Sequence, residues 1–508
     1  MAETQVPISA LPPEILSQIF IDCLDPHKPA AMVSTSAPLL LTQICSPWRT
    51  IAHTTPFLWT RTHLFLAYFR PGSMDTATSE NEAEIQAQED EARLPHIKSW
   101  FSRTGPDLPL HLSISDELIF ANFDSCITDY VLTLLPRIET LDLQLCRRTL
   151  PRFTEFVPNA YARLRALRIA GDGFEPSEWS FLPFDAPLFE QFSARILYCA
   201  LLSLPLAWAR LTRLAVSFFP NLSDRPLTTT LLEVLNQTPL LKSLRMMLSG
   251  DRIHGRHALD TYTDPVVLPD LRVLQLRYDA GSTVYRLFPL LKTPALEEVE
   301  MDAYDLQRFM FSRPKGVRKG VRKVEVATPE YRSNWVVQCL PLLSGLKHLV
   351  LHNPRRATMT GTFALNVAGH FYSVVEALAP LETGSYEYEG VEGKRVPPCP
   401  DLERLELRDD YSRGNCEEHF RQVVDLLRRS IHPDQRGDTS NDVGPGSSGI
   451  SLKSLSIPKE WLSGSGRALE SDFEEVTRGV QVELWSRWDD EGEGWLTRGY
   501  WRDEWYDA

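Results

Sequence analysis

Patterns for disulfides and metal ligands are missing from this sequence. Its eight cysteines are scattered along 508 residues, with no C-x-x-C pair and no spacing typical of zinc ligands. Neither a disulfide framework nor a structural metal site follows from such a scatter. We therefore expect no bound metal and no cofactor.

Signals for export and for membrane insertion are also missing. The N-terminal residues include an early acid, Glu3, and several prolines, where a secretory signal needs a basic start and an apolar run. The longest apolar stretch, 196–209, contains Pro205 and is shorter than the roughly 18 residues that a membrane span requires. We expect an intracellular protein, cytoplasmic or nuclear or both, with no membrane partner.

The chain lacks a surplus of positive charge. Its 53 Lys and Arg residues face 67 Asp and Glu residues, for a formal net charge of −14. Proteins that bind nucleic acids or anionic membranes need a surplus of basic residues to neutralise phosphates. We therefore expect protein partners and no nucleic acid. The segment 313–323 is locally basic. It could be a nuclear-import signal or contact an acidic partner. We favour a third interpretation, a tight turn between repeats.

Familiar catalytic motifs do not occur in the sequence. It contains no H-E-x-x-H, no G-x-S-x-G, no P-loop and no glycine fingerprint after a strand. Its 12 histidines do not stand near a cysteine or serine in a recognised arrangement. We predict that the protein is not an enzyme and has no catalytic residues. An enzyme with an unrecognised arrangement is the alternative.

Three short apolar segments are present near the N-terminus. The first, 11–26, has Pro12 and Pro13 in its opening turn, where a missing N–H costs nothing, and apolar residues at three- and four-residue spacing. Further apolar runs follow at 38–52 and 55–66. We predict three short helices, which bury too little surface to be stable alone. They form either the cap of a larger fold or a module that packs on a partner.

The ordered motifs LPPEIL, IC-x-x-WR and TPFLW resemble the F-box, in the version found in fungal proteins that open with LPPEIL. The resemblance covers about Ile8 to Leu66 and implies an apolar face that packs on the Skp-type adaptor of cullin–RING ubiquitin ligases. One departure is Pro47, where the family commonly has a basic residue, so we expect the second helix to break near Ser46. Another is the insert 27–37, which lengthens the first connection. The adaptor contacts that the resemblance implies are Leu11, Pro12, Pro13, Glu14, Ile15, Leu16, Ile19, Phe20, Cys45 and Trp48.

The next segment is polar and acidic. Residues 71–92 contain almost no large apolar side chains, so burial cannot offset the entropy cost of ordering them. We predict a flexible acidic insertion over 70–93. Helical spacing resumes at 94–105, and 108–116 alternates apolar and polar residues as a strand does.

A six-residue core, apolar-x-x-apolar-x-apolar, recurs beyond residue 135. Successive cores start roughly 22 to 30 residues apart through 346, which is the leucine-rich-repeat range. The last two gaps are about twice as long, so each hides either a decayed repeat or an insertion. Helical spacing occurs within them at 361–378 and 417–431. The cores begin at 138, 164, 189, 211, 241, 271, 296, 321, 346, 402 and 452.

These cores predict an α/β fold. Parallel strands alternating with helices would build a leucine-rich-repeat solenoid, a curved parallel sheet with helices outside. The units resemble leucine-rich repeats, although only Cys146 meets the Asn/Cys position after the core. The alternative is a set of unrelated strands in an ordinary α/β fold. The expected domains are an F-box at 1–69, the acidic insertion at 70–93, a solenoid at 94–485 with loops near 380–399 and 432–450, and a Trp-rich acidic tail at 486–508. The tail would either close the solenoid or dock as a peptide.

Residues between the apolar core positions would face solvent on the concave side of the sheet. In strand order they form a basic, an acidic and a mixed patch, so we hypothesise a protein substrate of complementary charge. The whole pattern predicts a substrate receptor of an SCF-type cullin–RING E3 ubiquitin ligase, acting in ubiquitin-dependent degradation. The alternative is a protein-interaction scaffold without a ligase role. The candidate substrate-binding residues are Arg168, Arg245, Arg277, Glu298, Glu300, Glu325, His348, His352, Arg404 and Arg408.

Overall fold

The computed structural model forms two compact units, within Met1–Thr238 and within Pro239–Gly494. The residues that the structure describes are 8, 11–25, 29–66, 79–115, 126–144, 153, 160–170, 186–197, 206–219, 227–248, 265–278, 284–312, 320–327, 336, 338–353, 378, 399, 401–409, 420–421, 424–425, 427–428, 452–458 and 467–485. The Trp-rich tail, Cys146 and most of the basic segment 313–323 lie outside these residues.

The first predicted helix is confirmed as α1 (Pro13–Asp22), which has proline in its first turn. Its apolar stripe buries Leu16 and Phe20. The Phe20 ring packs against Trp48, with the ring centroids 4.8 Å apart. Sequence spacing therefore places one face of α1 in the core of the N-terminal helices.

The break in the second helix is also confirmed. α2 (Leu41–Ile44) stops at Cys45, whose backbone is extended, and α3 (Ser46–His53) begins directly after it. Pro47 lies in the first turn of α3, a position where its missing N–H has no helical partner to lose. The chain thus breaks one residue before the predicted position.

The third predicted helix, 55–66, is wrong in its second half. η2 (Pro56–Trp59) is a single 3₁₀ turn, and β2 (Arg61–Phe65) follows it. The β-branched residues Thr60 and Thr62 suit an extended backbone better than a helix. β2 pairs in parallel with the next strand of the chain, so the repeat sheet already includes part of the predicted F-box at 1–69.

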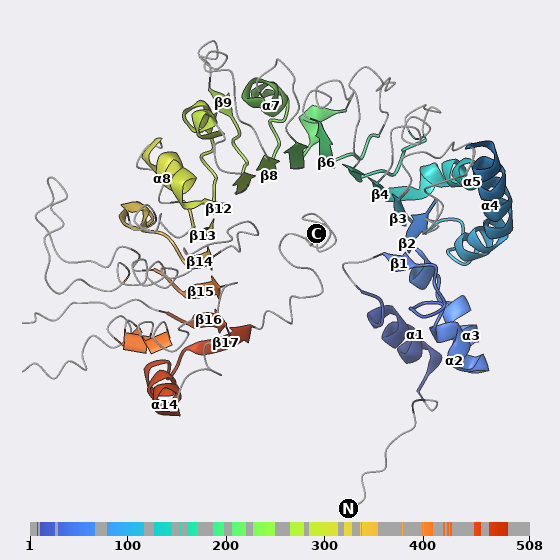
Figure 1. The fold of residues 1–508 in the computed structure, drawn as a ribbon, viewed down its shortest axis with the longest axis horizontal. Coiled ribbons are helices and arrows are strands. Elements are labelled where there is room, and N and C mark those ends of the chain that lie inside the picture. The colour runs from blue at the N-terminus through green and yellow to red at the C-terminus, as the bar shows by residue number, and fades with distance from the viewer. Residues whose placement is uncertain are drawn as a thin grey trace, which may run out of the picture. The chain divides into compact units, whose positions relative to one another are not determined.

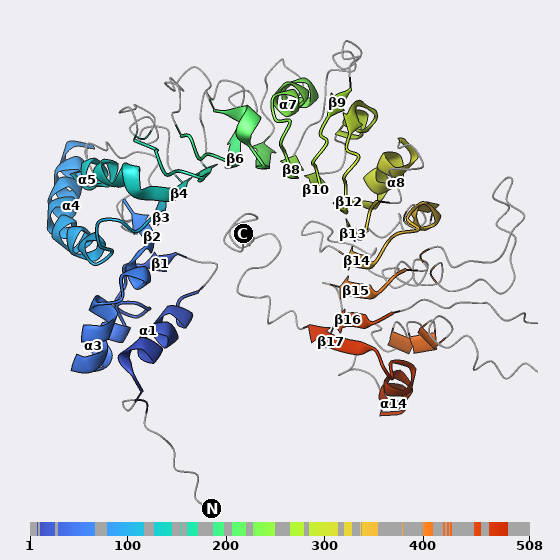
Figure 2. The ribbon, with the colours of Figure 1, turned by 180° about the vertical axis from the view of Figure 1, so that it is seen from behind.

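The sheet of the first unit is wholly parallel. Its strands lie in chain order from β1 to β7. Figure 1 shows α4 and α5 along one side of β2 to β4, and Figure 2 shows the same arrangement from behind. The remaining elements of this unit are β1 (Ala30–Ala31), α4 (Ser79–Ser102), β3 (Leu110–Ser115), α5 (Cys126–Leu134), η3 (Leu135–Arg137), β4 (Ile138–Gln144), β5 (Ala166–Ala170), β6 (Gln191–Leu197), η6 (Trp208–Arg210), β7 (Arg213–Phe219) and α7 (Leu227–Asn236).

The predicted flexible insertion, 70–93, is wrong over its later part. Residues 79–93 are helical and begin α4. At the end of the predicted insertion, Asp90 is buried and forms an ion pair with Arg93, with 3.6 Å between Oδ1 and Nη1. The Arg93 guanidinium also donates to the Phe65 carbonyl oxygen at the end of β2. Alanine and glutamate favour helix, and these contacts anchor an acidic sequence that has little apolar surface of its own.

The strands of the second unit are also parallel, in the order β8, β10, β12, β13, β14, β15, β16, β17. α8 and α14 lie on the outer side of its strands (Figure 1). The short strands β9 and β11 pair separately. The elements are β8 (Ser243–Leu248), β9 (Val266–Val267), β10 (Val273–Tyr278), η7 (Val284–Leu290), β11 (Leu291–Lys292), β12 (Glu298–Asp302), α8 (Ala303–Ser312), β13 (Lys323–Ala327), η8 (Leu340–Leu342), β14 (His348–Asn353), β15 (Arg404–Asp409), β16 (Ser454–Pro458), α14 (Arg467–Val476) and β17 (Gln481–Trp485).

Every predicted core coincides with a strand or leads into one, which gives the α/β repeat architecture expected of a leucine-rich-repeat-type solenoid. The apolar core positions, for example Leu349 and Leu351, are buried, and each large aliphatic side chain contributes roughly 1.5–3 kcal/mol by its burial. β14 pairs directly with β15, and β15 with β16. The two long gaps are therefore insertions between neighbouring strands, and no decayed strand lies within the sheet there. Helical residues between 420 and 428 confirm part of the helix expected at 417–431.

Candidate functional site

Parallel register aligns the concave side chains of the second unit into rows. One row contains Gln275, Glu300 and Glu325, and continues through Val350 to Glu406. The core sequences produce such rows because alternate residues of a strand point to the same face, and neighbouring strands lie about 4.8 Å apart. Carboxylates from distant parts of the sequence thus come side by side.

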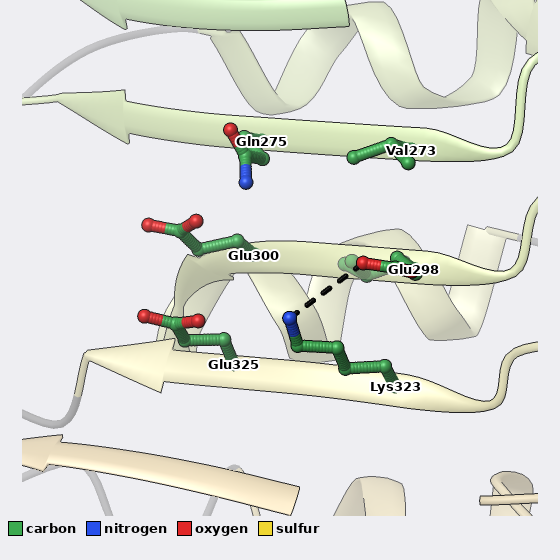
Figure 3. Close-up of a pocket in the computed structure, with 7 residues that line it drawn as sticks. Val273, Gln275, Glu298, Glu300, Lys323 and Glu325 are labelled. Atoms are coloured by element: carbon green, nitrogen blue, oxygen red, sulfur yellow. Dashed lines mark ion pairs between the residues drawn. The ribbon is translucent and has the colours of Figure 1, made fainter. Parts of the chain in front are cut away.

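A small pocket opens on this face between β10, β12 and β13 (Figure 3). Glu300 is largely buried, and Glu325 stands opposite it in register on the next strand. Like charges placed opposite each other on neighbouring strands repel. Lys323 offsets part of the negative charge, with its Nζ 3.7 Å from Oε2 of Glu298. The pocket is lined by Val273, Gln275, Glu298, Val299, Glu300, Lys323 and Glu325.

Farther along the same face, three basic side chains contact the carboxylate of Glu406. Its Oε1 lies 2.8 Å from His348 Nε2 and 2.8 Å from Arg404 Nε, and its Oε2 lies 2.7 Å from Arg408 Nη2. Burial by itself would raise the pKa of Glu406, but the hydrogen bond from His348 and the charge and hydrogen bonds of Arg408 outweigh it and lower the pKa to about 2. The carboxylate therefore stays ionised, and its partners are held on the sheet.

Two of these basic residues also contact a second carboxylate. Arg404 Nη2 lies 3.0 Å from Oε2 of Glu483 on β17, and Arg408 Nη1 lies 3.9 Å from Oε1 of Glu325 on β13. Glu406 and its three basic partners thus form, with Glu325 and Glu483, a connected network of polar contacts across β13 to β17. A network of this kind fixes the positions of its charges, and fixed charges favour selective recognition over tight non-specific binding.

The other predicted substrate-binding residues are dispersed. Arg168 belongs to the first unit, where its Nε lies 3.9 Å from Oδ1 of Asp142. Arg245 is half-buried on β8, in register with Gln275. Arg277 and His352 belong to β10 and β14, but their side chains lie outside the described part of the structure.

Sequence reasoning missed a buried polar cluster on the corresponding row of the first unit. The imidazole of His63 lies 2.8 Å from the Ser113 hydroxyl through Nδ1 and 3.0 Å from the Ser115 hydroxyl through Nε2. The Ser113 hydroxyl also donates to Asp142, at 3.4 Å. Here a serine lies between histidine and aspartate, whereas in a hydrolase triad the histidine lies between the other two. The alternation of R-T-H-L-F in β2 was the signal that could have located His63.

The N-terminal helices carry the second candidate surface. Some of the predicted adaptor contacts are exposed on these helices, and others are buried. Leu16 and Phe20 lie in the core of the chain itself, with 4% and 0% of their surfaces exposed, so they position α1 and do not present a contact surface. Ile15 is half exposed. Pro12, Pro13, Glu14 and Cys45 are exposed, and Leu11, Ile19 and Trp48 are half-buried.

Apolar side chains outside the predicted adaptor contacts are also exposed on or near these helices. They are Ile8, Val33, Leu40, Ile44 and Phe57, of which Ile44 and Phe57 are the most exposed, at 56% and 58%. Together with Ile15 they make six of the eleven large apolar residues that are exposed in the described part of the chain. All six lie within 50 residues of sequence, on the segment that resembles the F-box.

The described residues form neither a metal site nor a membrane span. No group of three or more His, Cys, Asp or Glu side chains there could hold a metal ion. None of the described helices is long and apolar enough to cross a bilayer.

Comparison with known proteins gives little further information. No protein-family model and no curated protein matches the sequence. Among solved structures, the chain is similar to the leucine-rich repeat-containing protein LegL7 from Legionella pneumophila, with 12% identity and a TM-score of 0.33 over 62% of this chain and 88% of that chain. A TM-score this low does not establish a shared fold. The assignment of a repeat solenoid therefore rests on the strand order and register of this chain.

Proposed function

We propose that this chain is a substrate receptor of an SCF-type cullin–RING ubiquitin ligase. The N-terminal helices dock on a Skp-type adaptor, the repeat sheets hold a protein substrate, and other subunits carry out the transfer of ubiquitin. The observation that carries the proposal is the group of exposed apolar residues between Ile8 and Phe57, together with the F-box resemblance of the same segment.

The exposed group suits a surface that another protein covers. Ile15, Ile44 and Phe57 lie on α1, α2 and η2. Val33 lies in the insert, Ile8 precedes α1, and Leu40 directly precedes α2. α1, α3 and η2 pack on one another. Burying the exposed half of one such side chain contributes about 1 kcal/mol, at roughly 25 cal/mol per Å² of apolar area. Several together supply the apolar centre that specific interfaces require.

The docking proposal is tested by measuring the affinity of the full chain for a purified Skp-type adaptor. Ile15→Asp and Phe57→Asp each place a carboxylate in the interface, and we expect each to weaken binding at least about tenfold because the charge would be desolvated. Val267→Asp is the matched control, since Val267 is equally exposed but belongs to β9 of the second unit. Absence of adaptor binding by the unmodified chain would remove the ligase role and leave an interaction scaffold.

For the substrate we propose a protein that presents positively charged side chains to the pocket. The pocket lining contains three glutamates and one lysine, and Arg408 Nη1 lies 3.9 Å from Oε1 of Glu325. Complementary charge steers association and selects partners. Replacing Glu298 and Glu300 by glutamine should change the set of captured proteins. The matched control replaces Glu474 and Glu475, exposed residues of α14, with the same change in net charge. An unchanged set with the pocket variant would contradict this assignment.

A further inference from the structure

The N-terminal helices are joined to the first repeats by a strand that their own insert supplies. β1 lies within the insert between α1 and α2, and it pairs in parallel with β2, Ala30 opposite Thr62 and Ala31 opposite His63. It is the first strand of the sheet, so it covers an edge of β2 that would otherwise expose unpaired backbone groups. The insert is therefore part of the repeat sheet.

Trp59 lies at the centre of the same junction and is fully buried. Its indole N–H donates to the carbonyl of Ala52 in α3, at 2.9 Å. Its ring meets Trp100 of α4 edge to face, with the centroids 4.8 Å apart, and the Arg103 guanidinium lies 4.4 Å from its centroid. Aromatic pairs and cation–π contacts of this kind add to the stabilisation that burial provides.

Trp100 completes the connection from the repeat side. Its indole N–H contacts two acceptors, the Trp59 carbonyl at 3.0 Å and the Thr62 hydroxyl at 2.7 Å. In addition, the backbone N–H of His111 in β3 donates to the carbonyl of Thr60, at 2.9 Å. One buried indole thus holds the end of η2 and the start of β2 at the same time.

The helices themselves are tied to this junction. The Thr55 hydroxyl contacts the Ser17 hydroxyl of α1, at 3.0 Å, and the Ile51 carbonyl of α3, at 2.8 Å. The inward residues Phe20, Ala52 and Leu58 are fully buried. Opening the junction would therefore disturb the helices that carry Ile15 and Phe57 at the surface.

We propose that the N-terminal helices and the first two long strands, β2 and β3, form a single cooperative unit, locked by Trp59, Trp100 and the edge strand β1. The lock fixes the orientation of the exposed apolar surface relative to the start of the repeat sheet. A flexible tether between an independent helical domain and the repeats is thereby excluded. The inference concerns the free chain, so it stands or falls separately from the proposed adaptor binding.

Hydrogen exchange of the full chain, read by mass spectrometry, tests the lock. Trp100→Phe keeps an aromatic ring and removes both indole hydrogen bonds. We expect amide exchange in α1, α3 and β2 to accelerate together, by about tenfold, because segments that open as one unit share one opening free energy. Thr62→Val removes the hydroxyl that accepts from Trp100 and donates to the Trp59 carbonyl oxygen, at 3.3 Å, but it leaves the indole in place. It should accelerate the same segments to a smaller extent, so it provides the test if Trp100→Phe does not fold.

Trp208→Phe is the matched control. Trp208 is also buried and also meets an aromatic ring edge to face, but that ring is Phe192 of β6, at 5.9 Å. We expect this change to leave the exchange of α1 and α3 unaltered. Acceleration confined to β2 and β3 in the Trp100 and Thr62 variants, with α1 and α3 unchanged, would overturn the inference. The adaptor measurement described above plays no part in this result.

Discussion

Replacing Glu406 by glutamine should destabilise the sheet of the second unit in a strongly pH-dependent way. An unfolded glutamate has a pKa of about 4.3, whereas the partners of Glu406 lower its pKa to about 2. At about 1.4 kcal/mol for each unit of difference, the ionised carboxylate contributes on the order of 3 kcal/mol at neutral pH. The Glu406 side chain is only 5% exposed, so solvent screening reduces this value little.

The sign of the pH dependence follows from the lowered pKa. The contribution is fully present above the unfolded pKa and is lost as the pH falls from about 4.3 toward 2. At pH 3 about half of it should remain. In the glutamine variant this loss cannot occur, so the difference between variant and native chain should shrink by about half between pH 7 and pH 3.

Local hydrogen exchange of β14, β15 and β16, corrected for intrinsic rates, measures the effect without assuming two-state unfolding of a large chain. The control is Glu403→Gln, which removes an exposed carboxylate that pairs with Lys347 at 3.2 Å and Lys453 at 3.1 Å. We expect a smaller effect from the control, because exposed ion pairs contribute little. Equal protection in the Glu406 variant and the native chain at pH 7 would refute the reasoning.

Three other outcomes follow from the described contacts. Phe20→Ala should lower the stability of the N-terminal helices by about 3–5 kcal/mol, because the ring is fully buried against Trp48. Limited proteolysis near α1 should become faster, and unchanged proteolysis would contradict this packing. Tyr161→Phe should cost about 1–2 kcal/mol, measured by urea denaturation, because its hydroxyl donates to the buried Phe153 carbonyl at 2.7 Å. Iodoacetamide at pH 8 should modify the exposed Cys23 and Cys45 well before Cys399, since burial raises the pKa of Cys399 to about 12; early labelling of Cys399 would show that the region around it is open.

The strands of the solenoid could be predicted because each one carries its own signal. The cores at 138 through 452 alternate apolar and polar residues, and the alternation alone requires an extended backbone with one buried face. β1 could not be found in this way, because Ala30 and Ala31 are small and have no alternating neighbours. The helical start of α4 was missed because one of its anchors, the hydrogen bond from Arg93 to the Phe65 carbonyl oxygen, joins residues that are far apart in the sequence.

The candidate site could be predicted only in part. Alternation identified the outward residues Glu300, His348 and Arg404, but not which of them would meet. The network at Glu406 depends on the register between strands whose cores begin 56 and 50 residues apart, at 346, 402 and 452, and sequence spacing does not determine that register. The sequence also did not determine which apolar side chains of the N-terminal helices are exposed. An amphipathic stripe does not show whether the rest of the chain or a partner protein covers it.

Zero-length carbodiimide cross-linking of the monomeric native chain tests the parallel stack most directly. Lys347, Glu403 and Lys453 precede β14, β15 and β16, and both lysines contact the same carboxylate. We predict two cross-linked peptides, Lys347 with Glu403 and Lys453 with Glu403, which place the starts of three strands side by side. Failure of Glu403 to couple to either lysine, while other lysine–carboxylate pairs react, would contradict the stacking of these strands in parallel.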